Sequence, residues 1–254
     1  MNDVNEHQRS TAARFGARAD AYVTSAVHAQ GDDLLALARL VAGAETARVL
    51  DLGCGGGHVA FTVAPHVANV VAYDLSTEML AAVTRTAHER GLRNINPICG
   101  PAERLPFPDA WFDFVFSRFS AHHWSDVPAG LAEARRVLRA GGRAAFVDVV
   151  APEAVQPDTF LQAIELLRDP THVRDYGPAQ WRSMLEAAGF APGDATLRRL
   201  RIDFATWIER MHTPPQHVVS IRALQQHMPR DVAELFAVEA DGSFTIDVLM
   251  VEAD

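Results

Sequence analysis

Residues 48–57 read R-V-L-D-L-G-C-G-G-G and combine a carboxylate with a dense run of glycines. The first half is a short apolar run, typical of a buried strand, with Asp51 near its end. Glycine then occupies four of the next five positions, which favours backbone with positive φ or backbone that a ligand approaches closely. From His58 the apolar spacing becomes helical. A loop between a strand and a helix is where open α/β sheets bind nucleotides.

The charge of Asp51 separates two classes of nucleotide. A dinucleotide loop presents a helix N-terminus to a pyrophosphate, and a carboxylate at its entrance would repel that phosphate. A ligand with no phosphate and a positive end suits the carboxylate instead. S-adenosylmethionine carries both an ammonium and a sulfonium. The charge and the loop spacing therefore disfavour an NAD-dependent oxidoreductase.

A second acidic residue, Asp74, ends the predicted strand 69–74, one βαβ step after Asp51. A carboxylate has two acceptor oxygens, so we expect Asp74 to accept hydrogen bonds from both ribose hydroxyls of an adenosine. Leu75 and Met79 follow and are predicted to flank the adenine ring. For Met79, a core position on an amphipathic helix explains the pattern at least as well.

Together these stretches resemble the class I S-adenosylmethionine-dependent methyltransferases, in the ubiquinone/menaquinone-biosynthesis-type branch (methyltransferase type 11). The resemblance covers about residues 15–190 and rests on V-L-D-L-G-C-G-G-G-H, Y-D-L-S, A-E-R-L-P-F, S-R-F-S-A-H-H-W and R-V-L-R-A-G-G. It implies S-adenosylmethionine as the cofactor and S-adenosylhomocysteine as the product. It says little about the acceptor, because this branch methylates quinones, sterols, phenols, amines and other small molecules.

The resemblance also implies a set of cofactor contacts around the glycine loop. Asp51 would act on the methionine ammonium, directly or through water. The backbone of the loop would pack against the cofactor, and Cys54 reads as a small loop filler, since no partner that activates its thiol is identified. The loop and strand-end members of this predicted set are Gly53, Cys54, Gly55, Ser117 and Arg118.

One stretch departs from the family pattern. Where the family usually reads G-D-A-E-x-L-P-F, with the Asp close to the adenine amino group, this chain has Pro101, Ala102 and Glu103. Pro101 removes one side-chain acceptor and one backbone donor. The prediction is that the Ala102 amide donates to the adenine ring and that Glu103 replaces the lost acceptor.

His122 and His123 follow the fourth predicted strand, at the edge of the crevice where an acceptor would lie. A histidine there is able to take a proton from a phenol, an enol or an activated carbon. In the alternative interpretation, one histidine faces solvent and the other orients the loop. A zinc site made with Cys99 lacks the spacing of metal ligands, so no metal is predicted.

The elements that must position these residues read as an α/β protein. Apolar runs near 49–52, 70–74, 95–99, 112–117 and 144–150 alternate with helical segments, as in a parallel sheet. A strand near 196–204 and a last strand at 244–251 follow. The family resemblance implies a Rossmann-like, seven-stranded, mostly parallel sheet of order 3-2-1-4-5-7-6 with helices on both faces.

We expect residues 1–254 to form a single methyltransferase domain. Its predicted parts are an N-terminal helical cap (1–43), a cofactor-binding half (44–150) and a substrate-side half (151–254) with a helical insertion at 205–237. In the family that the chain resembles, such a cap covers the cofactor. Tyr22 and His28 are the candidate lid residues, and Tyr22 is a predicted cofactor contact; packing or surface roles are the alternative. Residues 151–176 read as an irregular lid whose polar cluster either binds an anionic acceptor or is solvated; its members are Arg168, His172, Arg174 and Tyr176.

Composition excludes several classes of function. The 254 residues carry a net charge of −9, and no basic stripe is present, which argues against a nucleic-acid substrate. All 23 basic residues are arginine, so Schiff-base and P-loop lysine chemistry are excluded. No signal-peptide pattern and no apolar run of membrane-spanning length are present, so we expect a cytoplasmic protein with no integral membrane segment. The oligomeric state stays open between monomer and homodimer.

The predicted reaction is methyl transfer from a sulfonium to a small-molecule acceptor by in-line SN2 displacement. Its main requirements are alignment of donor and acceptor and exclusion of water. Carbon and oxygen acceptors are weakly favoured over nitrogen. The alternative from another class is a non-catalytic S-adenosylmethionine or S-adenosylhomocysteine binder on the same fold, which would have a blocked or absent acceptor cavity.

Overall fold

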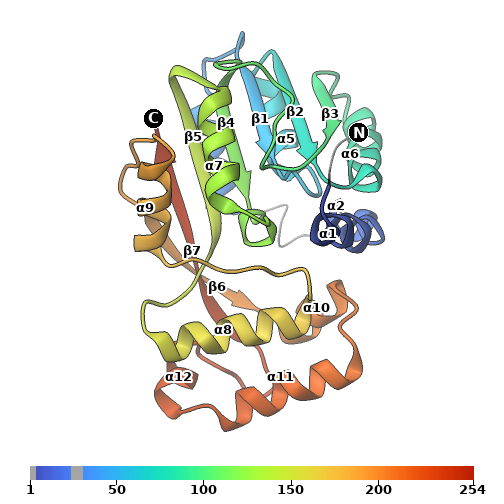
Figure 1. Ribbon diagram of the computed structural model, residues 1–254. Coiled ribbons are helices and arrows are strands. Elements are labelled where there is room, and N and C mark those ends of the chain that lie inside the picture. The colour runs from blue at the N-terminus through green and yellow to red at the C-terminus, as the bar shows by residue number, and fades with distance from the viewer. Residues whose placement is uncertain (1–3, 24–30) are drawn as a thin grey trace.

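The computed structural model describes residues 4–23 and 31–254. Seven strands form one sheet of order β3-β2-β1-β4-β5-β7-β6, with β7 antiparallel to both of its neighbours and all other pairs parallel (Figure 1). This confirms the predicted fold class and strand order. The strands are β1 (Arg48–Leu52), β2 (Asn69–Asp74), β3 (Ile95–Cys99), β4 (Phe112–Arg118), β5 (Leu138–Val150), β6 (Thr196–Ile202) and β7 (Phe244–Ala253).

The helices surround this sheet in three groups. At the N-terminus are α1 (Glu6–Gly16) and α2 (Ala19–Val23), at the carboxyl edge of the first strands in Figure 1. The helices flanking the sheet are α4 (Asp32–Leu40), α5 (His58–Val63), α6 (Thr77–Glu89), α7 (Val127–Val137) and α9 (Pro178–Ala187). The third group is α8 (Val155–Arg168), α10 (Phe204–Arg210), α11 (Pro215–His227) and α12 (Arg230–Leu235).

Each face of the sheet has its own apolar core, because side chains alternate between the two faces of a strand. In β1, Leu50 and Leu52 pack on the side that includes Leu131 of α7 and Trp181 of α9. Val49 belongs to the opposite core, which α4, α5 and α6 complete. The carboxyl edge of the parallel strands lies between these two cores, so residues at the strand ends converge there.

A third core replaces the predicted lid over 151–176. Helix α8 occupies most of the first half of this segment. Its Leu161 and Ile164 are fully buried against Trp207 of α10 and Ile221 of α11. The interpretation of this segment as irregular is therefore wrong. Its apolar residues recur at helical spacing, and they cover the end of β6 and the start of β7. Figure 1 shows this helical layer beyond the carboxyl edge of the sheet.

Strand β5 begins at Leu138, six residues before the predicted start at 144, and pairs there with Phe112 across a register shift. In the part of the chain that the structure describes, every helix is too short or too polar to cross a membrane. The candidate lid residue His28 lies outside the described residues.

Candidate active site

The carboxyl edge of β1 to β4 carries a cavity of about 970 Å³, including its open mouth. Helix α1 contributes four of its lining residues, so the N-terminal cap lies over it. Most residues that the sequence predicted at the cofactor site line this cavity. These are Tyr22, Asp51, Gly53, Cys54, Gly55, Asp74, Leu75, Met79, Ala102, Glu103 and Arg118, together with His123.

Two predicted residues, Pro101 and Ser117, are not among the lining residues. The Pro101 carbonyl accepts a hydrogen bond from the hydroxyl of Tyr73 at 3.2 Å, which orders the turn after β3. Ser117 is 3% exposed, within β4. Both residues therefore lie behind the cavity wall, and the backbone around them shapes it.

The glycine loop has the conformation that its sequence predicts. Gly53 and Gly55 have φ of 71° and 47°, in the left-handed region where glycine is favoured. At Gly56 the reason for glycine is different: a Cβ there would lie 2.8 Å from the carbonyl oxygen of Tyr22. The same Tyr22 carbonyl lies 2.9 Å from Nε2 of His58 and accepts its hydrogen bond. The absence of a side chain thus lets the cap lie directly on the loop.

Asp51 is buried at the base of the cavity, with 1% of its surface exposed. One carboxylate oxygen accepts the backbone N–H of Ala60 at 2.9 Å. Burial, reinforced by the nearby charge of Asp74, raises the pKa of Asp51 to about 7, against the lowering effect of that hydrogen bond. A buried carboxylate with a raised pKa is stabilised in its charged form by a cation placed beside it.

Asp74 links the second strand to the glycine loop. Its two carboxylate oxygens accept the N–H groups of Gly55 and Ser76, each at 2.9 Å. Each oxygen has a second lone pair, so the carboxylate remains able to accept further hydrogen bonds from a ligand. Burial raises the pKa of Asp74, and its backbone hydrogen bonds oppose that rise.

Glu103 has partners that the sequence did not predict. One oxygen accepts the N–H of Ser125 at 2.8 Å, and the other accepts the side-chain amide of Gln8 on α1 at 3.0 Å. Glu103 therefore connects the cap to the loop after β4, which adds a structural role to its predicted contact with adenine. No pattern within a single segment indicated this, because Gln8 is 95 residues away.

Arg118 and Cys54 have mainly structural surroundings. Arg118 lies at the end of β4, lines the cavity and forms an ion pair with Asp33 of α4, which also pairs with Arg198 at 3.3 Å. Cys54 is buried, and burial raises the pKa of its thiol well above the ordinary value. A thiol held in its protonated form is a poor nucleophile, in agreement with its interpretation as a loop filler.

A second cavity of about 660 Å³, including open space, adjoins the first. The two share Phe15, Tyr22, Phe119 and His123. The remaining wall comes from the turn after β4, from β5, from α8 and the loop that follows it, from α10, and from strands β6 and β7. Its members are His122, Val149, Glu165, Arg168, Asp175, Leu200, Ile202, Trp207, Arg210 and Ile246.

The two predicted catalytic histidines meet at this second cavity but differ in environment. Nδ1 of His122 lies 2.5 Å from Oδ1 of Asp148, near the end of β5. Burial alone would lower the pKa of His122, but the charge and hydrogen bond of Asp148 outweigh it and raise the pKa to about 9. Asp148 was not among the predicted site residues, although an acid inside the apolar run F-V-D-V-V was a signal for it.

His123 is held by the backbone instead. Its Nδ1 lies 3.0 Å from the carbonyl oxygen of Thr171, which accepts the hydrogen bond, so Nδ1 carries the proton. Burial and the neighbouring charge of His122 lower the pKa of His123 to about 3. His123 is therefore neutral near pH 7, and its ring lines both cavities.

Comparison with known proteins identifies the family. A family model described as a methyltransferase domain matches residues 50–146. YcgJ of Bacillus subtilis, an uncharacterized methyltransferase, is 35% identical over 224 residues, 88% of each chain. Its crystal structure superposes with a TM-score of 0.84 at 32% identity, covering 87% of this chain and 97% of that one. The chain belongs to the class I S-adenosylmethionine-dependent methyltransferases.

Two further relatives align with most of the length of this methyltransferase. The uncharacterized protein YafE of Escherichia coli is 43% identical over 201 residues, 79% of this chain and 97% of YafE. A malonyl-[acyl-carrier protein] O-methyltransferase of Pectobacterium atrosepticum is 30% identical over 84% of this chain and 86% of its own length. Because it belongs to this family, the enzyme uses S-adenosylmethionine as its cofactor.

The first cavity fits that cofactor on chemical grounds. Its base holds the buried Asp51 carboxylate, whose raised pKa shows that the site favours an added positive charge. Asp74 offers free acceptor lone pairs beside it, and apolar Leu75 and Met79 line the same wall. A carboxylate at each of two strand ends suits a cationic nucleoside better than a pyrophosphate.

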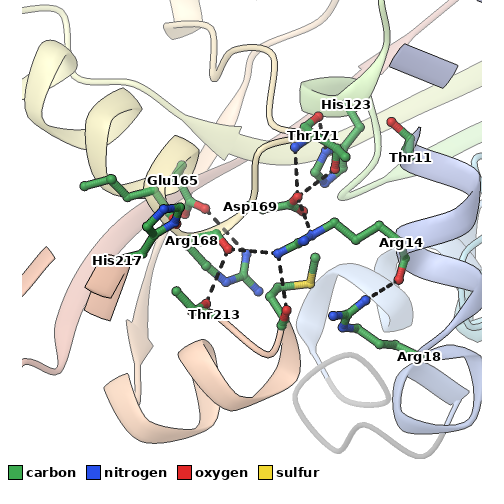
Figure 2. Close-up of polar contacts among 12 residues, drawn as sticks. Thr11, Arg14, Arg18, His123, Glu165, Arg168, Asp169, Thr171, Thr213 and His217 are labelled. Atoms are coloured by element: carbon green, nitrogen blue, oxygen red, sulfur yellow. Dashed lines mark hydrogen bonds and ion pairs between the residues drawn. The ribbon is translucent and has the colours of Figure 1, made fainter. Parts of the chain in front are cut away.

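Arg14 of α1 connects the cap of the methyltransferase to the layer of α8 and α10 (Figure 2). Its Nε lies 2.9 Å from Oδ1 of Asp169, and its Nη2 donates to the carbonyl oxygens of Arg168 and Met211, each at 3.2 Å. These acceptors lie at the C-terminal ends of α8 and α10. One side chain thus ties the lid of the first cavity to the layer that lines the second.

Replacing Arg14 with glutamine is expected to destabilise the methyltransferase. Asp169 is 1% exposed and would lose its cationic partner, so we expect the free energy of unfolding to fall by about 1–3 kcal/mol. Affinity for S-adenosylhomocysteine should fall as well, since the cap closes less firmly. Denaturant titration and calorimetry measure the two effects.

The matched control is Arg9→Gln on the same helix, where the exposed guanidinium donates to the Val4 carbonyl and to no other group of the described residues. This variant is expected to change stability by less than about 0.5 kcal/mol. Equal effects of the two substitutions on both measurements would show that Arg14 does not act as a clamp.

Proposed function

We propose that the methyltransferase transfers the methyl group of S-adenosylmethionine to a small molecule held in the second cavity, at an oxygen or carbon atom. The observation that carries this proposal is the wall of four residues that the two cavities share. An acceptor in the second cavity lies next to a donor in the first, as in-line displacement requires. The Pectobacterium relative is named for O-methylation, which supports an oxygen acceptor.

Within the first cavity, we assign the cofactor contacts as the sequence predicted them. Bound S-adenosylmethionine supplies an electrophilic methyl group on its sulfonium. Asp51 binds the ammonium end, Asp74 accepts from the ribose hydroxyls, and Leu75 and Met79 flank the adenine. The cap, through Phe15 and Tyr22, excludes water from the junction of the cavities.

His122 is the proposed general base, with Asp148 as its positioning partner. The carboxylate accepts from Nδ1 of His122 at 2.5 Å, which leaves Nε2 of the neutral ring to take a proton from the acceptor. His123 is a weaker base because its pKa is about 3. Its position on both cavities suits it to align the acceptor. The base assignment thus moves to His122 from the pair that the sequence predicted.

The competing functions make different predictions about the same cavities. A non-catalytic cofactor binder would have a blocked or absent acceptor cavity, whereas here a second cavity adjoins the first and shares four of its lining residues. The test is titration calorimetry with S-adenosylhomocysteine, S-adenosylmethionine and NADH, followed by transfer of an isotope-labelled methyl group to a panel of hydroxylated aromatics, enols and amines. Binding of the first two ligands with labelled product supports the proposal. Binding without product from any acceptor favours the non-catalytic alternative.

Affinity for S-adenosylmethionine is expected to fall as the pH drops below 7. Without ligand, Asp51 has a pKa of about 7, and the ammonium binds its ionised form. Protons therefore compete with the cofactor below that pH, by up to about tenfold per pH unit. Calorimetry at pH 5.5 to 8.5 measures the effect, and Asp51→Asn should remove the pH dependence. An affinity that stays constant across this range would contradict the assignment.

A further inference from the structure

The carboxylates in or beside the second cavity are each matched by a basic residue. This balance leaves no surplus negative charge to attract a cationic acceptor. The pairs are Asp148 with His122, Asp169 with Arg14, Glu165 with Arg168, and Asp175 with His172, at 2.5, 2.9, 3.5 and 3.9 Å.

The pair of Asp175 and His172 carries little charge. Burial, together with the charges of His122 and His123, lowers the pKa of His172 to about 2. Burial raises the pKa of Asp175 well above its ordinary value. Both shifts favour the neutral forms of the imidazole and the acid, so the pair contributes little charge to the cavity wall.

Arg210 is the exception to this pairing. It ends α10, is half-buried and lines the second cavity but not the first. Within residues 4–23 and 31–254, no hydrogen bond or ion pair engages its side chain, although Glu165 lies close enough to act on it electrostatically. Burial lowers the pKa of Arg210, but a guanidinium stays protonated in proteins. Among the described residues, one positive charge in the cavity wall is thus left without a hydrogen-bonded or ion-paired partner.

The remaining wall is apolar. Trp207 and Ile246 are buried there, and Leu200 and Ile202 line the cavity beside them. Such a surface suits a flat or cyclic hydrocarbon body. A guanidinium in an apolar, partly water-excluded wall binds a carboxylate or similar oxyanion through charge-assisted hydrogen bonds.

We propose that the second cavity selects methyl acceptors with an apolar, ring-containing body and an anionic group, and that Arg210 binds that anion. The inference rests on the proposed function, because it takes the second cavity as the acceptor site. The acceptor then has two polar ends. Its anion lies at Arg210, and the atom to be methylated lies near His122 and His123. Arg210 is a specificity-determining residue in this arrangement.

The test compares two probes that differ in one charge: 6-hydroxy-2-naphthoate and 6-hydroxy-2-naphthamide. Their affinities are measured by calorimetry on the protein saturated with S-adenosylhomocysteine. The acid is expected to bind at least about tenfold more tightly than the amide. Arg210→Gln should abolish this preference, and Arg210→Lys, which keeps the charge, should retain part of it. Arg230→Gln, an exposed control on α12 whose ion pair is with Glu234 on the same helix, should retain all of it.

Three results would overturn the proposal: equal affinities for the two probes, no binding of either probe, or a preference that persists in Arg210→Gln. Affinity of each variant for S-adenosylhomocysteine and its melting temperature show that it is folded. The experiment requires no methyl transfer, so its outcome is independent of the proposed function. If no acceptor in the panel is methylated, the preference for the acid is still measurable. If turnover occurs without that preference, only the role of Arg210 fails.

Discussion

Replacing Asp74 with alanine is expected to weaken binding of S-adenosylmethionine by about 1–3 kcal/mol while the sheet remains folded. The variant loses the charge-assisted hydrogen bonds assigned to the ribose. It also frees the N–H of Gly55, which Asp74 holds at 2.9 Å, so the loop becomes less ordered for the cofactor. Calorimetry with S-adenosylhomocysteine measures the loss directly.

Two further variants separate these contributions. Asp74→Asn keeps one acceptor oxygen for the Gly55 amide and loses the charge, so its affinity should lie between those of the wild type and Asp74→Ala. Asp194→Ala, at an exposed carboxylate remote from the cavities, should bind as the wild type does. An affinity unchanged in Asp74→Ala would mean that the ribose lies elsewhere.

Replacing His122 with glutamine is expected to lower kcat by about 10²- to 10⁴-fold, the usual contribution of a general base. Affinity for the cofactor should stay the same, because His122 does not line the first cavity. In the wild type, kcat/KM should rise with pH and level off near 9, since only unprotonated His122 accepts a proton and its pKa is about 9. Steady-state rates from pH 6 to 10 measure this profile.

Asp148→Asn tests the physical cause of that profile. The charge and hydrogen bond of Asp148 raise the pKa of His122, so removing the charge should move the inflection to lower pH. An NMR titration of His122 should show the same shift without any turnover. His227→Gln, on the exposed side of α11, serves as the control and should leave both profiles unchanged. A wild-type rate that is independent of pH in this range would exclude His122 as the base.

The cofactor side of the enzyme was largely determined by the sequence. Asp51, the glycine loop and Asp74 each sit at or just after the end of a short apolar run, and parallel strands end at one edge of a sheet. Local patterns along the chain, combined with the strand order that the family resemblance implied, therefore predicted which residues would converge at that edge. The structure confirms that order and places eleven of the thirteen predicted cofactor residues in the first cavity.

Two residues near the first cavity have roles that the local sequence did not predict, because their partners are distant in the chain. Glu103 holds Gln8 of α1 as well as the loop at Ser125, and Pro101 faces Tyr73 behind the cavity. The order of residues around Glu103 is nearly that of the family. The added role of Glu103 depends on the position of the cap, and no pattern near residue 103 predicts that position.

The proposed acceptor site was decided by the tertiary structure. The second cavity draws its wall from α1, β5, α8, α10, β6 and β7, and its polar residues are scattered along the sequence as solvated positions usually are. Whether His122 is a strong base and His123 a weak one depends on burial and on Asp148, which is 26 residues from His122. Spacing along the chain determines which strand ends meet, whereas charge and proton affinity depend on neighbours that only the folded chain brings together.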